Sequence, residues 1–348
     1  MTQQPLSFPV FLIADVGGTT LRIGRMIAGS HTVQHVLRFP TEGLALYPGE
    51  RGVELQRRVV DQLVATLTAY LLSAEGAGIE AVGIAFAGPL TAQGMVIAAP
   101  TIWGAGAPPL PLGKLLQKRI QLPVTVANDI TAAAWRYSET EDQPFCLFTV
   151  SSGIGNKVFW RGEVLTGEDG HGGELGHWCV DQSAEAIACD CGGRGHLGAV
   201  ASGRGVVAVA IRVAQRQPRR FFRSCLFEHA RGQPERITSN ALATAVRAGD
   251  LFAVNILHEA LRPLASAIAC LFAAIGIRRF LFIGGFATAV GGRFLSILGD
   301  ELVRLGCFGL NEAATHAMLQ LGVPDDDHSL IGMGRMLTTA LVQQPVKR

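Results

Sequence analysis

The chain has 348 residues, of which 49% are hydrophobic and 17% are charged. This length suits two domains, and the composition supports a large core and excludes an intrinsically disordered chain. The formal net charge is only +2, which offers no polyelectrolyte basis for binding nucleic acid. We therefore expect a globular protein with a small-molecule partner and no nucleic-acid partner.

Cysteine usage and hydropathy predict a cytoplasmic protein. The chain has seven cysteines, an odd number, and its first residues lack the basic start and small-residue cleavage site of a secretory leader. In a reducing compartment, cysteines serve the core or a metal site rather than disulfides. The most apolar segment, residues 264–277, is shorter than the roughly 20 residues that span a bilayer. We therefore expect a buried helix there and no membrane partner.

Apolar periodicity predicts alternating strands and helices in the first half of the chain. A buried strand over residues 10–14 runs into a glycine turn, and a second strand follows over residues 21–27. The apolar stripe of residues 53–72 is typical of a helix. The pattern then predicts a strand over 81–87, a long loop over 88–111, a strand over 124–127 and a helix over 130–137. Long loops in compact domains are often functional.

The second half repeats the opening plan. Residues 146–150 predict a strand, residues 151–156 a glycine turn and residues 157–160 a second strand. We therefore expect a duplicated architecture with one such hairpin in each half. The remaining predicted elements are helices over 203–215, 239–248 and 251–275 and a strand over 279–283. Strands and helices that alternate throughout predict an α/β protein.

Three glycine-containing turns follow predicted strands. Their residues are Asp15 with Gly17, Gly18, Thr19 and Thr20; Ser152 with Gly153 and Gly155; and Gly284 with Gly285. Glycines let backbone N–H groups approach phosphate, and an aspartate at a strand end can hold Mg²⁺. The alternative for the first turn is a glycine hairpin with a capping aspartate. Three such turns together predict a bound nucleotide, although neither the Rossmann nor the Walker motif is present.

Asn128 and Asp129 lie between a predicted strand and a predicted helix. Asn and Asp are the preferred N-cap residues of helices, so a structural role is one interpretation. The functional interpretation makes Asp129 a general base that accepts the proton of an attacking hydroxyl. Asn128 offers both a donor and an acceptor to a neighbouring hydroxyl.

Four potential metal ligands lie within a short, glycine-rich segment. They are His177, Cys189, Cys191 and His196. Structural zinc takes four Cys or His ligands in a tetrahedron, so this spacing predicts a structural Zn²⁺ site. Cys179 is a possible substitute ligand. In the alternative interpretation, the cysteines are small apolar residues and His177 is an ordinary surface residue.

Glu174 precedes the first of these ligands by three positions. A zinc ion on His177 would also fix the backbone that aims the Glu174 carboxylate. A carboxylate accepts hydrogen bonds from two vicinal hydroxyls, so Glu174 and His177 suit a polyol substrate. The alternative is a surface glutamate without a ligand.

These segments together resemble the ROK family, named from repressor, open reading frame and kinase. The resemblance lies in Asp15-Val-Gly-Gly-Thr19, Asn128-Asp129, Glu174-Leu-Gly-His177, Cys189-Asp-Cys191-Gly-Gly-Arg-Gly-His196 and Gly284-Gly285. It implies an actin-like, RNase H-like α/β fold of two domains with a central cleft. It also implies a dimer that uses ATP and Mg²⁺ to phosphorylate a hydroxyl of a sugar.

The resemblance also implies roles and domain bounds. Asp129 is then the catalytic base, and the sugar contacts are Asn128, Glu174, His177 and Gly88. Residues 15–20 and 152–155 border the phosphates. The N-terminal domain covers residues 1–127, the larger C-terminal domain with the zinc loop covers 128–330, and a last helix at about 331–348 returns to the first domain.

Three departures from the family pattern bear on the substrate. His196 replaces the third zinc cysteine, Gly198 replaces a sugar-binding glutamate, and Thr101 replaces an asparagine. A lost carboxylate should weaken glucose binding by a factor on the order of 10 or more. Some family members phosphorylate seven-carbon cyclitols, which we therefore expect as the substrate class, at a hydroxyl that we expect to be primary.

Three alternatives remain open at this point. One is a sugar-binding protein without catalysis, against which the retained Asp129 and the glycine turns argue. A glucokinase, fructokinase or N-acetylhexosamine kinase differs from a cyclitol kinase only in its substrate. A sugar-responsive repressor would carry a winged helix–turn–helix before the kinase-like part, and only 14 residues precede Asp15. We therefore expect an enzyme rather than a regulator.

Overall fold

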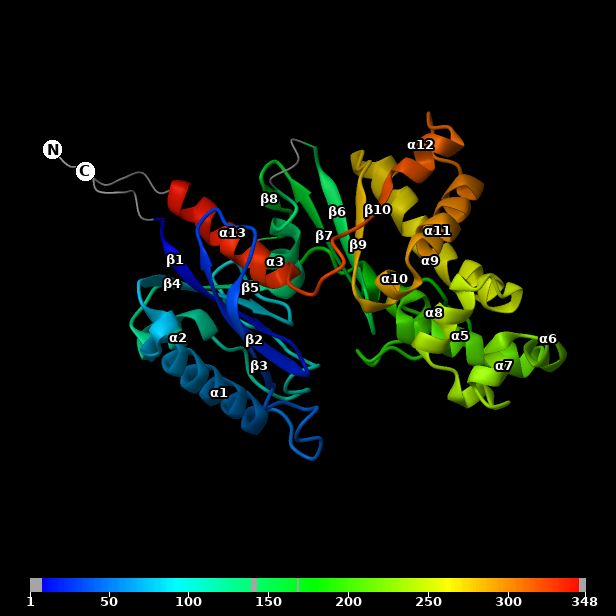
Figure 1. Ribbon diagram of the computed structural model, residues 1–348. Helices are drawn as coiled ribbons and strands as arrows, with labels where there is room; N and C mark the ends of the chain where they lie inside the picture. The colour runs from blue at the N-terminus through cyan, green and yellow to red at the C-terminus, as the bar shows by residue number, and fades with distance from the viewer. Residues whose placement is uncertain (1–7, 139–142, 168, 344–348) are drawn as a thin grey trace. The chain divides into compact units, whose positions relative to one another are not determined.

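The computed structural model describes residues 8–138, 143–167 and 169–343 (Figure 1). The chain divides into two compact units, the first with residues up to 141, residues 162–172 and residues from 325 onward. The second unit takes residues 142–161 and 173–324. Compared with the predicted boundary after residue 127, the first unit also contains Asn128, Asp129 and the helix that they begin. This helix packs against the C-terminal helix of the same unit.

The sheet of the first unit has the strand order β3-β2-β1-β4-β5. β1, β2 and β3 are antiparallel neighbours, whereas β1, β4 and β5 run parallel. The strands are β1 (Val10–Val16), β2 (Thr20–Ile27), β3 (Gln34–Pro40), β4 (Ile79–Phe86) and β5 (Val124–Asn128). The strands predicted over residues 10–14, 21–27, 81–87 and 124–127 are all present. The edge strand β3 is mostly exposed, so it lacks the apolar run that would have predicted it.

Helices cover both faces of this sheet. Leu12 and Ala14 of β1 join a core that includes residues of the first two helices, while Phe11 and Ile13 join a core that includes residues of the last helix. This alternation is what a strand buried on both faces requires. The helices are α1 (Val53–Leu72), the 3-10 turn η1 (Ala74–Gly76), α2 (Leu112–Ile120), α3 (Asp129–Trp135) and α13 (His328–Gln343). The predicted end of the last helix, residues 344–348, lies outside the described residues.

The second unit repeats this plan in the order β10-β9-β6-β7. β6 and β7 form an antiparallel hairpin, and β9 and β10 extend the sheet in parallel. The strands are β6 (Phe145–Val150), β7 (Ile154–Trp160), β9 (Phe280–Ile283) and β10 (Leu319–Leu321). The residues of the short strand β8 (Glu163–Val164) belong to the first unit. The turn predicted over 151–156 is shorter, because pairing continues to Val150 and Ile154. Gly155 therefore lies within β7.

The helices of the second unit surround its core (Figure 1). Those expected from the sequence are α5 (Gly203–Arg216), α8 (Ser239–Arg247) and α9 (Leu251–Ile275). The structure adds η3 (Leu175–His177), α4 (Leu197–Ala201), α6 (Pro218–Phe222), α7 (Cys225–His229), η4 (Pro234–Arg236), α10 (Gly285–Val290), α11 (Gly292–Leu305) and α12 (Glu312–Ala317).

In the described part of the chain, one helix is long and apolar enough to cross a membrane, namely α9 with 25 residues. Its buried side chains, among them Leu257, Leu261 and Leu264, belong to the main hydrophobic core of the second unit. A core helix meets the same criterion of length and composition. The apolar segment predicted as a buried helix over residues 264–277 corresponds to the second half of α9.

Candidate active site

In the first unit, the carboxyl ends of three parallel strands carry predicted site residues. Val16 of β1 pairs with Phe86 of β4, and Phe86 pairs with Asn128 of β5. Adjacent strands lie about 4.8 Å apart, so the end of β1 lies roughly 10 Å from the end of β5. The structure thus gathers at one sheet edge the residues Asp15, Gly17, Gly18, Thr19, Thr20, Gly88, Asn128 and Asp129.

Asp15 pairs across the β1–β2 hairpin with Arg22. Arg22 donates to Oδ2 of Asp15 from Nη2 at 2.5 Å and from Nε at 3.2 Å. Burial, the largest influence, raises the pKa of Asp15, and the Arg22 guanidinium opposes this shift. The arginine therefore stabilises the ionised form of a carboxylate that burial disfavours.

Arg22 also meets two aspartates from the far end of the chain. Its Nη1 lies 3.2 Å from Oδ2 of Asp326 and 3.3 Å from Oδ1 of Asp327. Sequence reasoning missed this cluster, because no local pattern links residues that are about three hundred positions apart. One arginine thus joins the predicted Mg²⁺ residue to the segment that leads into α13.

The β1–β2 turn packs closely on the long loop of the first unit. A Cβ atom on Gly18 would lie 2.7 Å from the backbone oxygen of Thr101. The hydroxyl of Thr41 donates to the backbone oxygen of Gly17 at 2.8 Å. Gly18 therefore lacks a side chain for a steric reason as well as for any ligand.

Asn128 caps α3 and also contacts Asp129. Its Oδ1 accepts from the N–H groups of Ile130 and Thr131 at 3.0 and 3.1 Å. Its Nδ2 donates to the backbone oxygen of Gly88 at 3.0 Å and to Oδ1 of Asp129 at 2.9 Å. The N-cap interpretation is therefore realised, and the side-chain amide of Asn128 holds the Asp129 carboxylate at the same time.

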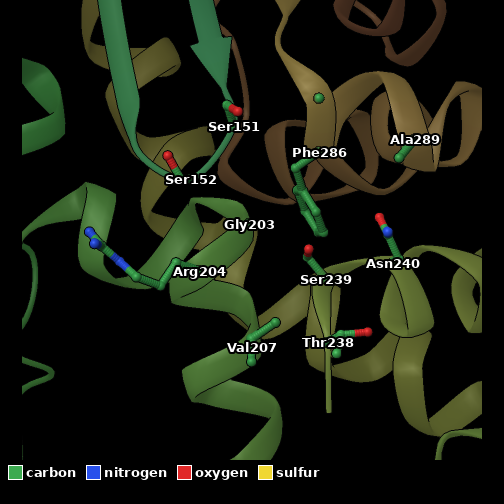
Figure 2. Close-up of a pocket in the computed structure, with 11 residues that line it drawn as sticks. Ser151, Ser152, Gly203, Arg204, Val207, Thr238, Ser239, Asn240, Phe286 and Ala289 are labelled. Atoms are coloured by element: carbon green, nitrogen blue, oxygen red, sulfur yellow. The ribbon is translucent and has the colours of Figure 1, made fainter. Parts of the chain in front are cut away.

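A cavity of about 500 Å³ lies in the second unit (Figure 2). The β6–β7 turn contributes Ser151 and Ser152, and α10 contributes Gly285 and Phe286. The carboxyl ends of β6 and β9 meet there because these strands are parallel neighbours. Two of the predicted turns therefore reach one cavity through Ser152 and Gly285. Gly153 and Gly284 shape these turns without lining the cavity, and Gly155 of β7 does not line it either.

The first residues of two further helices complete this cavity. Arg204 of α5 and Asn240 of α8 line it, and the sequence analysis assigned them no role. The available signal was helix capping, since Ser202 accepts from the N–H of Gly205 at 3.1 Å and Thr238 from that of Ala241 at 3.2 Å. Helix starts present backbone N–H groups without intrahelical partners.

Glu174 and His177 lie at the two ends of a short turn, and this turn packs against β7. Glu174 has 52% of its side chain exposed, and its Oε1 lies 3.7 Å from Nζ of Lys157. The backbone N–H of Leu175 donates to Oδ1 of the buried Asn156 at 3.0 Å. Sequence reasoning assigned no role to Asn156 or Lys157, although two polar residues in succession inside an apolar strand were a visible signal.

The four predicted zinc ligands form one cluster. The ligand atoms of His177, Cys189, Cys191 and His196 all lie within 4.8 Å of one another. Sγ of Cys189 lies 3.9 Å from Nδ1 of His177, and Sγ of Cys191 lies 3.2 Å from Nδ1 of His196. Tetrahedral zinc with ordinary bond lengths separates its ligand atoms by roughly 3.3–3.8 Å. The donor set and its spacing therefore fit this ion.

Cys179, the alternative ligand, is not in this cluster. Its thiol donates to the backbone oxygen of Asp181 at 3.7 Å and lies 3.9 Å from that of Arg194. Burial is the main influence that raises the pKa of Cys189, and a hydrogen bond from the backbone N–H of Cys191 opposes this shift.

A family model described as the ROK family matches residues 47–299, well over half of the chain. The chain belongs to the ROK family. Two curated relatives from Streptomyces hygroscopicus, of the subspecies jinggangensis and limoneus, are named C(7)-cyclitol 7-kinase and are each 54% identical. The alignments cover 98% of this chain and 97% of the first relative, and 95% and 94% for the second.

Among solved structures, a ROK family glucokinase from Streptomyces griseus in complex with glucose and AMPPNP is similar to this chain. It shows a TM-score of 0.70 and 25% identity over 94% of this chain and 98% of its own. The predicted fold class, an actin-like ATPase fold built of α/β units, is confirmed. The predicted family is confirmed as well.

The structure also places the three departures of this ROK family chain. Thr101 touches Gly18 through its backbone oxygen, as described above. A Cβ atom on Gly198 would lie 3.1 Å from the backbone oxygen of Gly176, so α4 approaches the Glu174 turn closely at that position. His196 joins the cluster of potential metal ligands. All three departures therefore lie against predicted site segments.

Proposed function

We propose that this protein is an ATP-dependent kinase that transfers the γ-phosphoryl group to a hydroxyl of a seven-carbon cyclitol. The similarity to two relatives named C(7)-cyclitol 7-kinase carries this proposal, at 54% identity over nearly the whole chain. The name of these relatives indicates position 7 as the phosphorylated hydroxyl. The site geometry supports residue roles that agree with this reaction.

Asp129 is the general base of the proposed reaction. Its carboxylate accepts the proton of the cyclitol hydroxyl as that oxygen attacks phosphorus. The 2.9 Å hydrogen bond from Asn128 to Asp129 supports the role, because a donor to the carboxylate favours its ionised form. Asn128 is then a positioning residue, since its amide is already engaged with α3, Gly88 and Asp129. This differs from the direct sugar contact implied by the family resemblance.

The cavity of the second unit is the nucleotide site of the proposed reaction. The cavity of the second unit, with Ser152, Asn240 and Gly285 on its wall, has the size of a small-molecule site. Asp15 and the Gly17–Thr20 turn would hold Mg²⁺ and the phosphates, because a single carboxylate with phosphate oxygens is a common magnesium arrangement. Magnesium would neutralise the charge that develops on the transferring group.

Glu174 and His177 bind the cyclitol hydroxyls, and a structural zinc ion holds their turn. The half-exposed Glu174 carboxylate can accept from two vicinal hydroxyls. The cluster of His177, Cys189, Cys191 and His196 supports zinc through its donor set and spacing. The metal would stabilise the loop and leave the chemistry to the side chains.

A hexokinase-type activity is the second candidate. The similarity to a glucokinase solved with glucose and AMPPNP favours it. Gly198 argues against it, because the chain has no carboxylate where the family pattern has a sugar-binding glutamate. We also infer a homodimer in a reducing compartment, where the cysteines outside the zinc cluster would stay as free thiols. Light scattering coupled to size exclusion tests the dimer.

ADP release across seven-carbon cyclitols, hexoses and N-acetylhexosamines tests the function. We expect the highest kcat/KM with a cyclitol, and a value for glucose that is lower by a factor on the order of 10 or more. Phosphorus NMR of the product identifies the modified hydroxyl. A preference for glucose or N-acetylmannosamine would establish the second candidate, and no ADP release with any polyol would refute a kinase.

A further inference from the structure

β7 carries two adjacent polar residues that are almost fully buried. Asn156 is 1% exposed and Lys157 is 3% exposed. They pair with Phe148 and Leu147 of β6, so they lie inside the hairpin rather than at its tip. A charged side chain is rarely buried to this extent unless it has a partner. These two residues therefore have a specific task.

Both residues contact the turn that carries Glu174. Asn156 accepts the backbone N–H of Leu175 at 3.0 Å, and the Lys157 ammonium lies 3.7 Å from the Glu174 carboxylate. A Cβ atom on Gly173 would lie 2.2 Å from the backbone oxygen of Asn156, so the chain crosses directly over β7. Asn156 thus fixes the backbone of the turn, and Lys157 contacts the carboxylate of Glu174.

We propose that Lys157 is a positioning residue that sets the cyclitol affinity by orienting the Glu174 carboxylate. This inference rests on the proposed function, in which Glu174 contacts the polyol. The buried ammonium has few alternative positions, while the glutamate side chain is half exposed and otherwise samples several rotamers. The ion pair selects the rotamers near Lys157 before the substrate arrives. The outer part of the carboxylate stays accessible to hydroxyls.

The two charges also tune selectivity for the substrate. A carboxylate that is held in place accepts hydrogen bonds from two vicinal hydroxyls at a defined spacing. Because the ion pair already orders the Glu174 side chain, binding of the cyclitol does not incur the loss of its rotamer entropy. Lys157 therefore acts on the polyol and leaves nucleotide affinity unchanged.

The test compares Lys157→Met, Glu174→Gln and the double variant. Lys157→Met keeps an unbranched side chain, shorter by one atom, and removes its charge. We expect KM for the cyclitol to rise roughly threefold to tenfold while KM for ATP stays within about twofold. Glu174→Gln should raise the cyclitol KM by roughly tenfold or more. In the double variant the cyclitol KM should match that of Glu174→Gln, because Lys157 acts through Glu174. Lys118→Met, at an exposed position on α2, is the matched control.

Thermal unfolding of the same variants separates positioning from folding. Glu174→Gln leaves the buried ammonium with one counter-charge fewer and should lower the unfolding midpoint, and Lys157→Met should restore it. A coupling in stability without coupling in cyclitol KM would make Lys157 purely structural and overturn the inference. Independent, multiplicative effects on KM would overturn it too. If the wild-type protein phosphorylates no polyol, the proposed function fails first, and this inference fails with it; if its best substrate is a hexose, the same cycle is measured on that hexose.

Discussion

The side-chain amide of Asn128 donates to the carboxylate of Asp129 at 2.9 Å, while the carbonyl oxygen of the same amide caps α3. Asn128 therefore caps α3 and also fixes the carboxylate of the proposed base, Asp129. The pair lies at the carboxyl end of β5, on the sheet edge that also carries Asp15.

Replacing the base should remove turnover and leave nucleotide binding intact. Asp129→Asn keeps the shape of the side chain but cannot accept the hydroxyl proton. We expect kcat to fall by at least about a hundredfold, the usual range for general-base removal, with ATP affinity unchanged by calorimetry. Asp61→Asn, at an exposed position on α1, should behave as wild type. Near-normal turnover in Asp129→Asn would remove Asp129 from the role of base.

Two variants of Asn128 should separate capping from positioning. Asn128→Asp keeps an oxygen that caps α3 and replaces the amide donor beside Asp129 by a like charge. Asn128→Ala removes both functions. We expect both variants to lose kcat, and only Asn128→Ala to lose the roughly 1 kcal/mol that an N-cap contributes. Urea unfolding and steady-state kinetics on the same samples provide the check. Equal stability losses would show that the cap and the donor cannot be separated.

Filling the cavity of the second unit should block the nucleotide. Gly285 lines the cavity, and a Cβ atom there would meet only the Ser151 hydroxyl, at 3.8 Å. Gly285→Leu should therefore fold and place its side chain in the nucleotide volume, raising KM for ATP by roughly tenfold or more. Gly292→Leu, at the exposed first residue of α11 with nothing within 4 Å, is the control. Unchanged ATP affinity in Gly285→Leu would move the nucleotide away from this cavity.

The zinc cluster should hold about one metal ion per chain by elemental analysis. Cys191→Ser should lose the metal and lower the thermal unfolding midpoint, because the loop then lacks its cross-link. Cys179→Ser should retain the metal, since its thiol faces backbone oxygens instead. Cys270→Ser, an exposed position on α9, serves as the second control. A protein purified without chelators that contains no zinc would refute the site.

Acid should destabilise the first unit through His328. Burial, followed by the charge of Arg136, lowers the pKa of His328 to about 4. Its ring nitrogen Nδ1 lies 3.0 Å from the Tyr137 hydroxyl, within hydrogen-bond distance. In the unfolded chain the same group titrates near pH 6.5. As pH falls from 6.5 to 4, the unfolded state therefore binds the proton first and the folded state loses stability, by up to about 3 kcal/mol.

Urea unfolding between pH 7 and pH 4 measures this loss. His328→Gln should show a shallower decline than the wild type in that window, because its side chain does not titrate. His229→Gln, at an exposed position on α7, should keep the wild-type slope. Parallel pH profiles for the wild type and His328→Gln would contradict the assignment.

The elements that the sequence predicted best are those with long, regular apolar patterns. The helices over residues 53–72 and 251–275 have the expected bounds. The exposed edge strand β3 lacks an apolar run, and the apolar pattern of helix α2 covers only nine residues, so both were missed. The turn after β6 was predicted too long, because glycine content alone does not reveal where strand pairing stops.

The amino-acid sequence alone determined the family, the fold class and the close spacing of the four predicted zinc ligands along the chain. Each of these depends on short motifs or on the periodicity within one segment, where spacing is visible. Tertiary structure alone decided the partners that come from distant segments. It placed Arg22 on Asp327 as well as on Asp15, and it brought the starts of α5, α8 and α10 to one cavity. It also set the ammonium of Lys157 beside Glu174. The physical reason is that strand register and helix packing are set by burial of the whole sheet, which joins residues that no local pattern connects.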